Sequence, residues 1–491
     1  MFTQLRIQNF KSWADTGEFR MAPLTGFFGT NSSGKTAILQ FLLMLKQTVE
    51  SSDRNRILHL GGDQYSYVDL GTTYDISHRH RLPQKLKFQF EWIPKYIDVS
   101  SLQIPVATSN IEIPIAIPSV EIPFTGKTSP LISYVNQNKN KPLKFESIIN
   151  IELEQIDFEF FRYAFIVDRY LEVDNYLEGD CGWNQITVIN GVNTNKGYYL
   201  CKDGKFFEEW EDLTKSLGHT FFRIKEVDDS QILKNYGVLN TTDLSELMGA
   251  FMDLFQNTYY LAPLREYPKR TYQWSGENPQ NVGKYGELTV AALLASRKKG
   301  TEVELSVAKA LQKLELIHNF RLNRIAPNRG DYEILVQKSP NSAEVLITDV
   351  GFGVSQVLPI LVLCYYAPKG ATLIFEQPEI HLHPSVQAGL ADIFIEVIKT
   401  RNIQIIIESH SEHLLRRLQR RIAEEKDGFT NDDAALYFCK MDDQGDSELV
   451  PLEIDTYGNI CNYPDGFFGD EMGDLVAMTE ASIKRQMNVG A

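Results

Sequence analysis

The chain has 491 residues, of which 43% are hydrophobic and 23% are charged, and its formal net charge is −15. This length accommodates roughly three domains, or one large α/β domain that carries an insertion. The negative charge disfavours a protein that binds nucleic acid over its whole surface, although it leaves a local basic groove open.

The cysteines and the apolar runs restrict the compartment. The five cysteines are scattered without a C-x-x-C pair, which predicts reduced thiols and argues against a zinc site or a disulfide framework. The longest apolar run, residues 357–367, is too short to cross a bilayer, and residues 1–10 alternate like a strand and lack the apolar core of a signal peptide. We therefore expect a cytoplasmic protein with no membrane partner.

A phosphate-binding loop is the first informative feature along the chain. Residues 29–36 read G-T-N-S-S-G-K-T, the pattern G-x-x-x-x-G-K-[ST]. The apolar run 24–28 before the loop predicts a strand, and the run 37–45 after it predicts a helix whose N-terminal dipole faces an anion. The sequence therefore predicts a nucleotide-binding protein.

The loop pattern assigns roles to its residues. Backbone N–H groups wrap the phosphates, the Lys35 ammonium reaches the β and γ oxygens, and the Thr36 hydroxyl ligates Mg²⁺. The predicted nucleotide-binding residues of the loop are Asn31, Ser32, Ser33, Gly34, Lys35 and Thr36.

The middle of the chain carries weaker signals. Gln64, in the turn-rich stretch 61–71, is either a glutamine that senses the γ-phosphate beside the metal or a solvated loop residue. From about residue 80 to 250, repeated Ile-Pro steps and many asparagines predict short edge strands and irregular loops, with mixed helix near 205–256.

A loop rich in Gly, Pro and aromatic residues is expected at 259–287. Its Arg265, Lys269 and Arg270 either bind phosphate or a partner, or pack in the loop with solvated charges. A helical pattern follows from 288 to 320.

Two strand ends predict the second half of the nucleotide site. The buried-strand run 372–375 ends at Glu376, the Walker B arrangement in which a carboxylate holds Mg²⁺ opposite the phosphate loop. A second apolar strand, 403–407, precedes His410, whose imidazole is placed to contact the γ-phosphate or orient the attacking water. Between the phosphate loop and these strands, residues 349–356 form a Gly-rich turn before an apolar helix, a second anion-binding device.

These motifs, in this order, resemble the ABC-type ATPase heads of the RecF, SMC and OLD group, in particular bacterial AAA-family predicted ATPases of the antiphage-defence type. The resemblance covers about residues 1–75 and 255–491. It rests on L-R-I-Q-N-F-K-S, the phosphate loop, Y-P-K-R-T-Y-Q-W-S-G, G-F-G-V-S-Q, E-Q-P-E-I-H-L-H-P and E-S-H-S-E-H. It implies an α/β P-loop NTPase fold with a mixed sheet flanked by helices and interrupted by a mainly β or mixed insert.

The resemblance also implies how the nucleotide is held. A head-to-head dimer sandwiches two ATP molecules, each between Lys35, Thr36 and Glu376 of one subunit and the signature turn of the other. Lys11 and Ser12 lie either near the bound nucleotide or in a plain surface turn. The signature residues are Gly351, Gly353, Ser355 and Gln356.

One position departs from the family pattern. The residue after the Walker B carboxylate is usually a glutamate that acts as the general base, and here it is Gln377. A glutamine positions water but does not accept its proton, so hydrolysis is either slow or relies on Glu379. A metal site made by Glu379 with His381 and His383 is less favoured than a role of these histidines in shaping the loop.

The expected organisation is a divided ATPase head. Residues 1–75 carry the phosphate loop, and 256–430 carry the signature turn, Walker B and the switch histidine. Residues 76–255 form an inserted recognition or partner domain, and 431–491 form a small C-terminal tail.

Three functions stay open at this level. The favoured one is an ATPase that assembles on ATP and controls a separately encoded effector, a nuclease or toxin, in antiphage defence. The second is a DNA-gripping clamp in repair or chromosome maintenance, for which the basic run Arg416, Arg417, Arg420 and Arg421 provides contacts unless nearby glutamates neutralise it. The third is an ATP-locked scaffold, which Gln377 favours.

Overall fold

The computed structural model describes residues 1–53, 56–94, 142–168, 181–189, 197–202, 205–206, 241–464 and 471–489. A six-stranded sheet in the order β11-β16-β17-β4-β18-β19 forms its centre. The first five strands pair in parallel, and β19 is antiparallel to β18. These strands are β4 (Leu24–Gly29), β11 (Thr258–Leu261), β16 (Thr372–Glu376), β17 (Gln404–Glu408), β18 (Ala434–Met441) and β19 (Ser447–Pro451).

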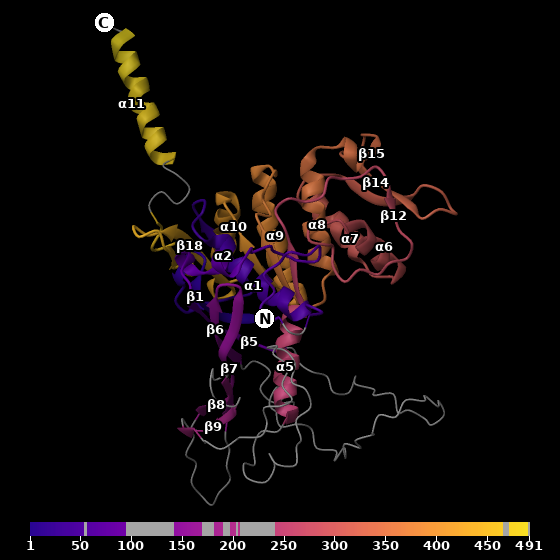
Figure 1. The fold of residues 1–491 in the computed structure, drawn as a ribbon. Coiled ribbons are helices and arrows are strands. Elements are labelled where there is room, and N and C mark those ends of the chain that lie inside the picture. Colours follow the sequence, from indigo (N-terminus) through magenta and orange to yellow (C-terminus); the bar gives the residue numbers. More distant parts are fainter. Residues whose placement is uncertain are drawn as a thin grey trace, which may run out of the picture.

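The central strands are apolar throughout because both faces of the sheet are buried. Phe28 and Phe375 face one hydrophobic core, whereas Phe27 and Ile374, one residue earlier on the same strands, face the other. Five helices contribute to the first core: α6 (Thr289–Lys298), α7 (Val303–Lys313), α8 (Phe352–Tyr366), α9 (Pro384–Arg401) and α10 (Glu412–Ala423). Helices α8, α9 and α10 stand together in Figure 1.

The second core joins the central sheet to an antiparallel sheet of nine strands, with α1 (Lys35–Glu50) and α5 (Thr241–Gln256) contributing to it. The antiparallel sheet runs in the order β10-β9-β8-β7-β6-β5-β1-β2, and β3 also pairs with β1. Its strands are β1 (Phe2–Phe10), β2 (Trp13–Asp15), β3 (Phe19–Arg20), β5 (Gln84–Trp92), β6 (Leu143–Glu152), β7 (Gln155–Asp168), β8 (Cys181–Ile189), β9 (Gly197–Lys202) and β10 (Lys205–Phe206).

The expected domain limits fall inside these sheets. Strands β5 to β10, within the predicted insert, extend the sheet that the N-terminal β1 begins. Strand β18, within the predicted tail, pairs in parallel with β4, which leads into the phosphate loop. The Ile-Pro steps at 104–123 lie outside the described residues.

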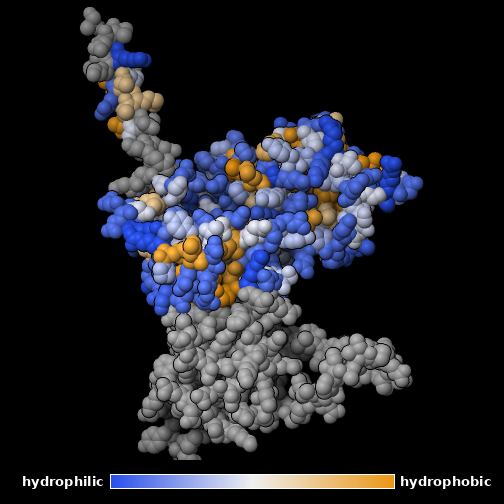
Figure 2. Space-filling view, in the orientation of Figure 1, coloured by the Kyte–Doolittle hydropathy of each residue, from blue (hydrophilic) through white to orange (hydrophobic). Residues whose placement is uncertain are grey.

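Smaller elements complete the described chain. A third sheet is built from β12 (Tyr272–Gln273), β13 (Asn319–Arg324), β14 (Asp331–Gln337) and β15 (Glu344–Leu346), and the last helix is α11 (Glu471–Val489). Hydrophilic residues dominate the described surface on the face shown in Figure 2, and hydrophobic residues gather there in a few clusters. Within the described ranges, no helix has both the length and the apolarity to cross a membrane.

Candidate nucleotide-binding site

The phosphate loop joins β4 to α1 and depends on two glycines with positive φ. Gly29 has φ 135° and a Cβ there would lie 2.1 Å from the carbonyl oxygen of Cys439, so β18 approaches closely enough to require glycine. Gly34 precedes α1 with φ 88°, and its carbonyl accepts the indole N–H of Trp13 at 3.0 Å. The loop is therefore held in place by both β2 and β18.

Lys35 lies in the loop with its ammonium against backbone carbonyls. The Nζ atom donates to the carbonyls of Gly29 at 3.1 Å and Thr30 at 2.5 Å. Burial lowers the pKa of Lys35, and the nearby Glu408 carboxylate opposes that shift. Among the other loop residues, Asn31 and Ser32 are exposed and Ser33 is buried. The ammonium is thus enclosed beside the exposed tip of the loop, as phosphate contact requires.

Lys11 and Ser12 lie beside this loop. The Ser12 hydroxyl accepts a hydrogen bond from the Ser447 hydroxyl at 2.7 Å. Both hydroxyls lie close to the position that a Cβ on Gly34 would take. The Lys11 ammonium donates to the Gln40 amide oxygen on α1 at 2.6 Å. The turn after β1 therefore packs on the base of the loop and its helix.

Two glutamates stand side by side at the ends of adjacent parallel strands. Glu376 ends β16 and Glu408 ends β17, and the two are register partners. The Tyr260 hydroxyl donates to Glu376 Oε2 at 2.6 Å. The Thr36 hydroxyl donates to Glu408 Oε1 at 2.8 Å. Because β17 lies between β4 and β16, Glu408 is the carboxylate that contacts the predicted magnesium ligand.

Sequence reasoning did not single out Glu408, since the segment E-S-H-S-E-H was interpreted through its histidine. The available signal was a glutamate as the last residue of an apolar strand. Only the strand order shows that this strand neighbours β4.

The carboxylates are arranged for a cation. Glu408 is 2% exposed and Glu379 is 7% exposed. Within the described residues, the Oε2 atom of each has no hydrogen-bond partner. Burial, and then the charge of Glu376, raise the pKa of Glu408 to about 7. Burial also raises the pKa of Glu379 and of Glu376. Buried carboxylate oxygens without partners are costly unless a positive group joins them.

Mg²⁺ fits this set better than a metal held by protein ligands alone. In the described part of the chain, no group of three or more His, Cys, Asp or Glu residues is close enough to hold a metal ion. Mg²⁺ is commonly bound through one or two carboxylates, waters and substrate phosphates, which matches the Thr36 hydroxyl and the neighbouring carboxylates. Which glutamate ligates the ion stays a prediction.

The turn after β16 is tied to the end of β17. Gln377 has φ 43°, its N–H donates to the Glu408 carbonyl at 2.9 Å, and its own carbonyl accepts an Arg265 N–H at 3.3 Å. Glu379 Oε1 accepts the His410 N–H at 2.6 Å. Desolvation and the Lys35 charge lower the pKa of His410, which favours its neutral imidazole. The predicted catalytic residues therefore form one connected group.

The signature turn begins α8. Gly351 precedes the helix, and the Ser355 hydroxyl donates to the Phe352 carbonyl within it at 2.8 Å. Ser355 and Gln356 are 7% and 2% exposed, so they are less accessible than the glycines of the turn. The Phe352 ring is exposed and lies 5.4 Å from the rings of Tyr267 and His381.

Gln64 is exposed in a turn that begins at Asp63. The Lys284 ammonium donates to the Ser66 carbonyl of this turn at 3.2 Å. Its charge also opposes the rise that burial causes in the pKa of Glu376. The turn therefore lies towards the carboxylates, and the role of Gln64 in sensing phosphate stays a prediction.

The histidines after Walker B shape the chain. His383 precedes α9, and its Nδ1 accepts the Ser385 N–H at 3.3 Å, the pattern of a helix cap. The cations of the loop expected at 259–287 lie in different surroundings. Lys269 pairs with Glu266, and Arg270 pairs with Asp349, near the surface. Arg265, in contrast, is buried.

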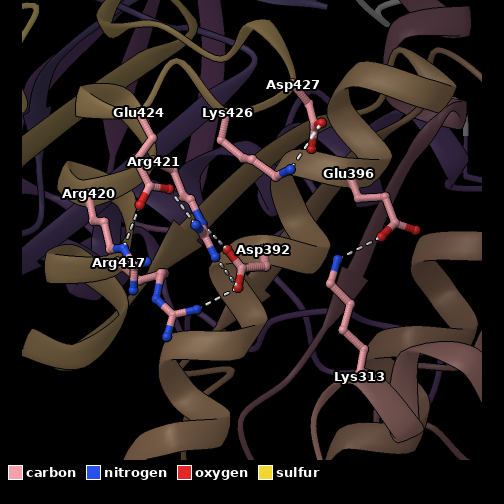
Figure 3. A network of polar contacts seen from close by, with 9 residues as sticks. All are labelled: Lys313, Asp392, Glu396, Arg417, Arg420, Arg421, Glu424, Lys426 and Asp427. Atoms are coloured by element: carbon pink, nitrogen blue, oxygen red, sulfur yellow. Dashed lines mark hydrogen bonds and ion pairs between the residues drawn. The ribbon is translucent and has the colours of Figure 1, made fainter.

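The basic run of α10 is neutralised by ion pairs (Figure 3). Arg417 and Arg421 both contact Asp392 on α9, and Arg420 and Arg421 both contact Glu424. Arg416 pairs with Glu412. The sequence left open whether this run contacts DNA or is neutralised by nearby acidic residues. In the described structure, each of the four arginines has an acidic partner.

Two family models match parts of this chain. Residues 289–415, which include α8, β16 and β17, match the family model of an AAA ATPase domain. Residues 429–478 match a family described as a protein of unknown function (DUF3696).

Solved structures similar to this chain are heads of SMC proteins. The head bound to the C-winged helix domain of ScpA has 11% identity and a TM-score of 0.40, over 92% of this chain and 98% of that one. The SMC head domain from Thermotoga maritima has 11% identity and a TM-score of 0.35, and the match covers 92% of this chain and 99% of that one. An Smc head with an extended coiled coil, bound to the C-terminal domain of ScpA and derived from Pyrococcus furiosus, has 11% identity and a TM-score of 0.38. That match covers 92% of this chain and 96% of that one. A search of curated proteins found no match.

The chain has the fold of a P-loop NTPase. Its evidence is the strand–loop–helix unit at β4 and α1, and the parallel strands whose carboxyl ends carry Glu376 and Glu408 beside the loop. Helices cover the sheet and the antiparallel strands adjoin it.

Proposed function

We propose that this chain binds and hydrolyses ATP with Mg²⁺, and that it assembles on ATP to control a partner protein. The observation that carries the proposal is the hydrogen bond from Thr36 to Glu408 beside the enclosed Lys35. It brings the last residue of a phosphate loop to a buried carboxylate at a strand end, as magnesium–nucleotide sites require.

Each residue of the group has a chemical task in this proposal. Lys35 and the loop N–H groups bind the phosphates, and Thr36 with Glu408 and Glu376 would hold Mg²⁺. The ion, when bound, neutralises charge on the β and γ oxygens. His410, whose neutral form is favoured beside Lys35, contacts the γ-phosphate side of the site.

The proton of the attacking water needs an acceptor. The Gln377 amide orients water but cannot take its proton, so we assign that task to Glu379 Oε2, which has no hydrogen-bond partner within the described residues and whose pKa burial raises. A base buried this deeply, and two residues beyond the usual position, favours slow turnover and a switch over a motor.

Assembly is proposed from the exposed rings at the signature turn. Tyr267 and Phe352 are 75% and 36% exposed, and their rings contact each other. Exposed apolar groups beside a glycine-rich helix start suit contact with the phosphate loop of a second copy. The resemblance to RecF, SMC and OLD heads supports the same head-to-head arrangement.

The partner is proposed to be a separately encoded effector, a nuclease or toxin, in antiphage defence. This part rests on the resemblance. The DNA-clamp alternative loses its best candidate surface, because the arginines of α10 are paired with Asp392, Glu412 and Glu424.

The test compares ATP hydrolysis and oligomeric mass for wild type, Lys35→Ala and Gln377→Glu. We expect slow hydrolysis and ATP-dependent assembly in wild type, and neither in Lys35→Ala. If wild type binds ATP and assembles without turnover, and Gln377→Glu gains activity, the protein is an ATP-locked scaffold. If wild type does not bind ATP, the proposal fails.

A further inference from the structure

Arg265 is a buried cation that none of the roles above uses. It follows β11 by four residues and is 5% exposed. Its Nη1 donates to the carbonyls of Pro263 at 3.0 Å and Gln377 at 3.3 Å. Its Nε and Nη2 are enclosed and have no hydrogen-bond partner in the described structure.

Such a guanidinium is costly as it stands. Burial lowers the pKa of Arg265 to about 10, so the group still carries its charge at neutral pH. A buried cation whose donors stay unsatisfied loses the hydration of those donors without replacement. Two carbonyl contacts from one nitrogen do not compensate this loss. In the described structure, the Nε and Nη2 donors of Arg265 therefore remain available to an anionic ligand.

The neighbours of Arg265 show where that anion belongs. Burial lowers the pKa of Arg265 and of Lys35; the charges of Glu379 and Glu376 oppose this shift at Arg265, and the charge of Glu379 opposes it at Lys35. Hydrogen bonds connect Arg265 to Gln377 and Gln377 to Glu408, and Glu408 accepts the hydroxyl of Thr36 in the phosphate loop. A guanidinium fork matches phosphate oxygens in geometry and charge.

The backbone amides of the loop bind the α- and β-phosphates, and Lys35 is the loop residue that reaches the γ-phosphate. We propose, building on the proposed ATP binding, that Arg265 binds the γ-phosphate held by its own subunit and thereby distinguishes ATP from ADP. Its ligand class is the terminal phosphate of a nucleoside triphosphate, and its role is that of a positioning residue.

A structural link explains how the signal leaves the site. Arg265 also holds the carbonyl of Gln377, whose φ of 43° is unfavourable for a residue with a side chain. The contact at 3.3 Å is long, so it is readily exchanged for a phosphate oxygen. The turn that carries Gln377 and Glu379 is therefore coupled to the presence of the third phosphate.

The experiment measures binding of Mg²⁺–ADP and of the non-hydrolysable β,γ-imido analogue of ATP by calorimetry. Arg265→Gln removes the charge, and Arg265→Lys keeps the charge without the fork. Arg321→Gln, which removes an exposed arginine paired with Glu344 on another sheet, is the matched control. Thermal unfolding of each variant without nucleotide reports folding.

For Arg265→Gln we expect the affinity for the imido analogue to fall at least about tenfold, and that for ADP less than about threefold. In Arg265→Lys, the ratio of the affinity for the imido analogue to the affinity for ADP should fall at least about threefold. Arg321→Gln should bind both nucleotides as wild type does.

Equal losses for both nucleotides, or none, would mean that Arg265 is only the structural counter-ion of Glu379. If Arg265→Gln does not fold, an unchanged nucleotide preference in Arg265→Lys overturns the inference. If wild type binds neither nucleotide, the proposed ATP binding itself is wrong, and the inference fails with it for a distinguishable reason.

Discussion

Glu408 should set part of the pH dependence of stability. Burial, and then the charge of Glu376, raise its pKa in the folded chain to about 7 from the ordinary glutamate value of 4.5. The folded chain therefore holds this proton more tightly, and the stabilisation is fully present below about pH 4.5 and lost as the pH rises through about 7. We expect wild type to lose on the order of 2–3 kcal/mol relative to Glu408→Gln between pH 5 and pH 8, measured by urea unfolding without nucleotide or Mg²⁺.

The matched control for this measurement is Glu448→Gln. Glu448 is half exposed on β19 and pairs with Lys440, so its variant should follow wild type. Parallel stability curves for wild type and Glu408→Gln would show that this carboxyl does not titrate in the window.

Gly34 combines a positive φ with close neighbours, and Gly17 separates the two effects. Gly17 has φ 67° and nothing within 4 Å of its added Cβ, whereas at Gly34 the Cβ would lie 2.3 Å from Ser447 Oγ. We expect Gly17→Ala to cost about 1 kcal/mol from the backbone alone. Gly34→Ala should cost more and weaken nucleotide binding, because the loop amides must move. Urea unfolding and nucleotide titration check both; equal costs with unchanged binding would contradict the prediction.

At the scale of elements, Asp392 joins α9 to α10. It accepts from Arg417 at 2.5 Å and from Arg421 at 2.5 and 3.1 Å, and its side chain is 14% exposed (Figure 3). Removing it leaves two guanidinium groups without their shared counter-ion, so Asp392→Ala should cost about 2 kcal/mol of unfolding free energy. Glu412→Ala breaks only the pair with the exposed Arg416 and should cost less than about 0.5 kcal/mol. Similar losses in chemical denaturation would refute a structural role for this network.

At the scale of the whole molecule, the exposed rings beside the signature turn should decide assembly. Phe352→Ser removes the ring that contacts Tyr267 and His381, so we expect ATP binding to persist and ATP-dependent assembly to be lost. Leu305→Ser is the control, since Leu305 is 49% exposed on α7 outside this cluster. Light scattering with the imido analogue gives the mass; an unchanged oligomer in Phe352→Ser would place the interface elsewhere.

Local patterns determined the elements that build the site. The loop 29–36 follows a buried strand and opens a helix, and the runs 372–375 and 403–407 are the strands β16 and β17, because glycine spacing and unbroken apolar runs reflect local backbone and burial demands. The order of motifs also indicated an ATPase, which the family match at 289–415 supports.

Only the tertiary structure decided which of these elements meet. Strand order places Glu408 against Thr36, puts β18 of the expected tail beside β4, and joins the expected insert to β1. Folding likewise separates Arg265, which is buried at the site, from Lys269 and Arg270, which pair near the surface. Neither outcome is encoded in sequence spacing, because pairing between residues hundreds of positions apart is set by the packing of whole elements, while composition within a segment reports only its own burial.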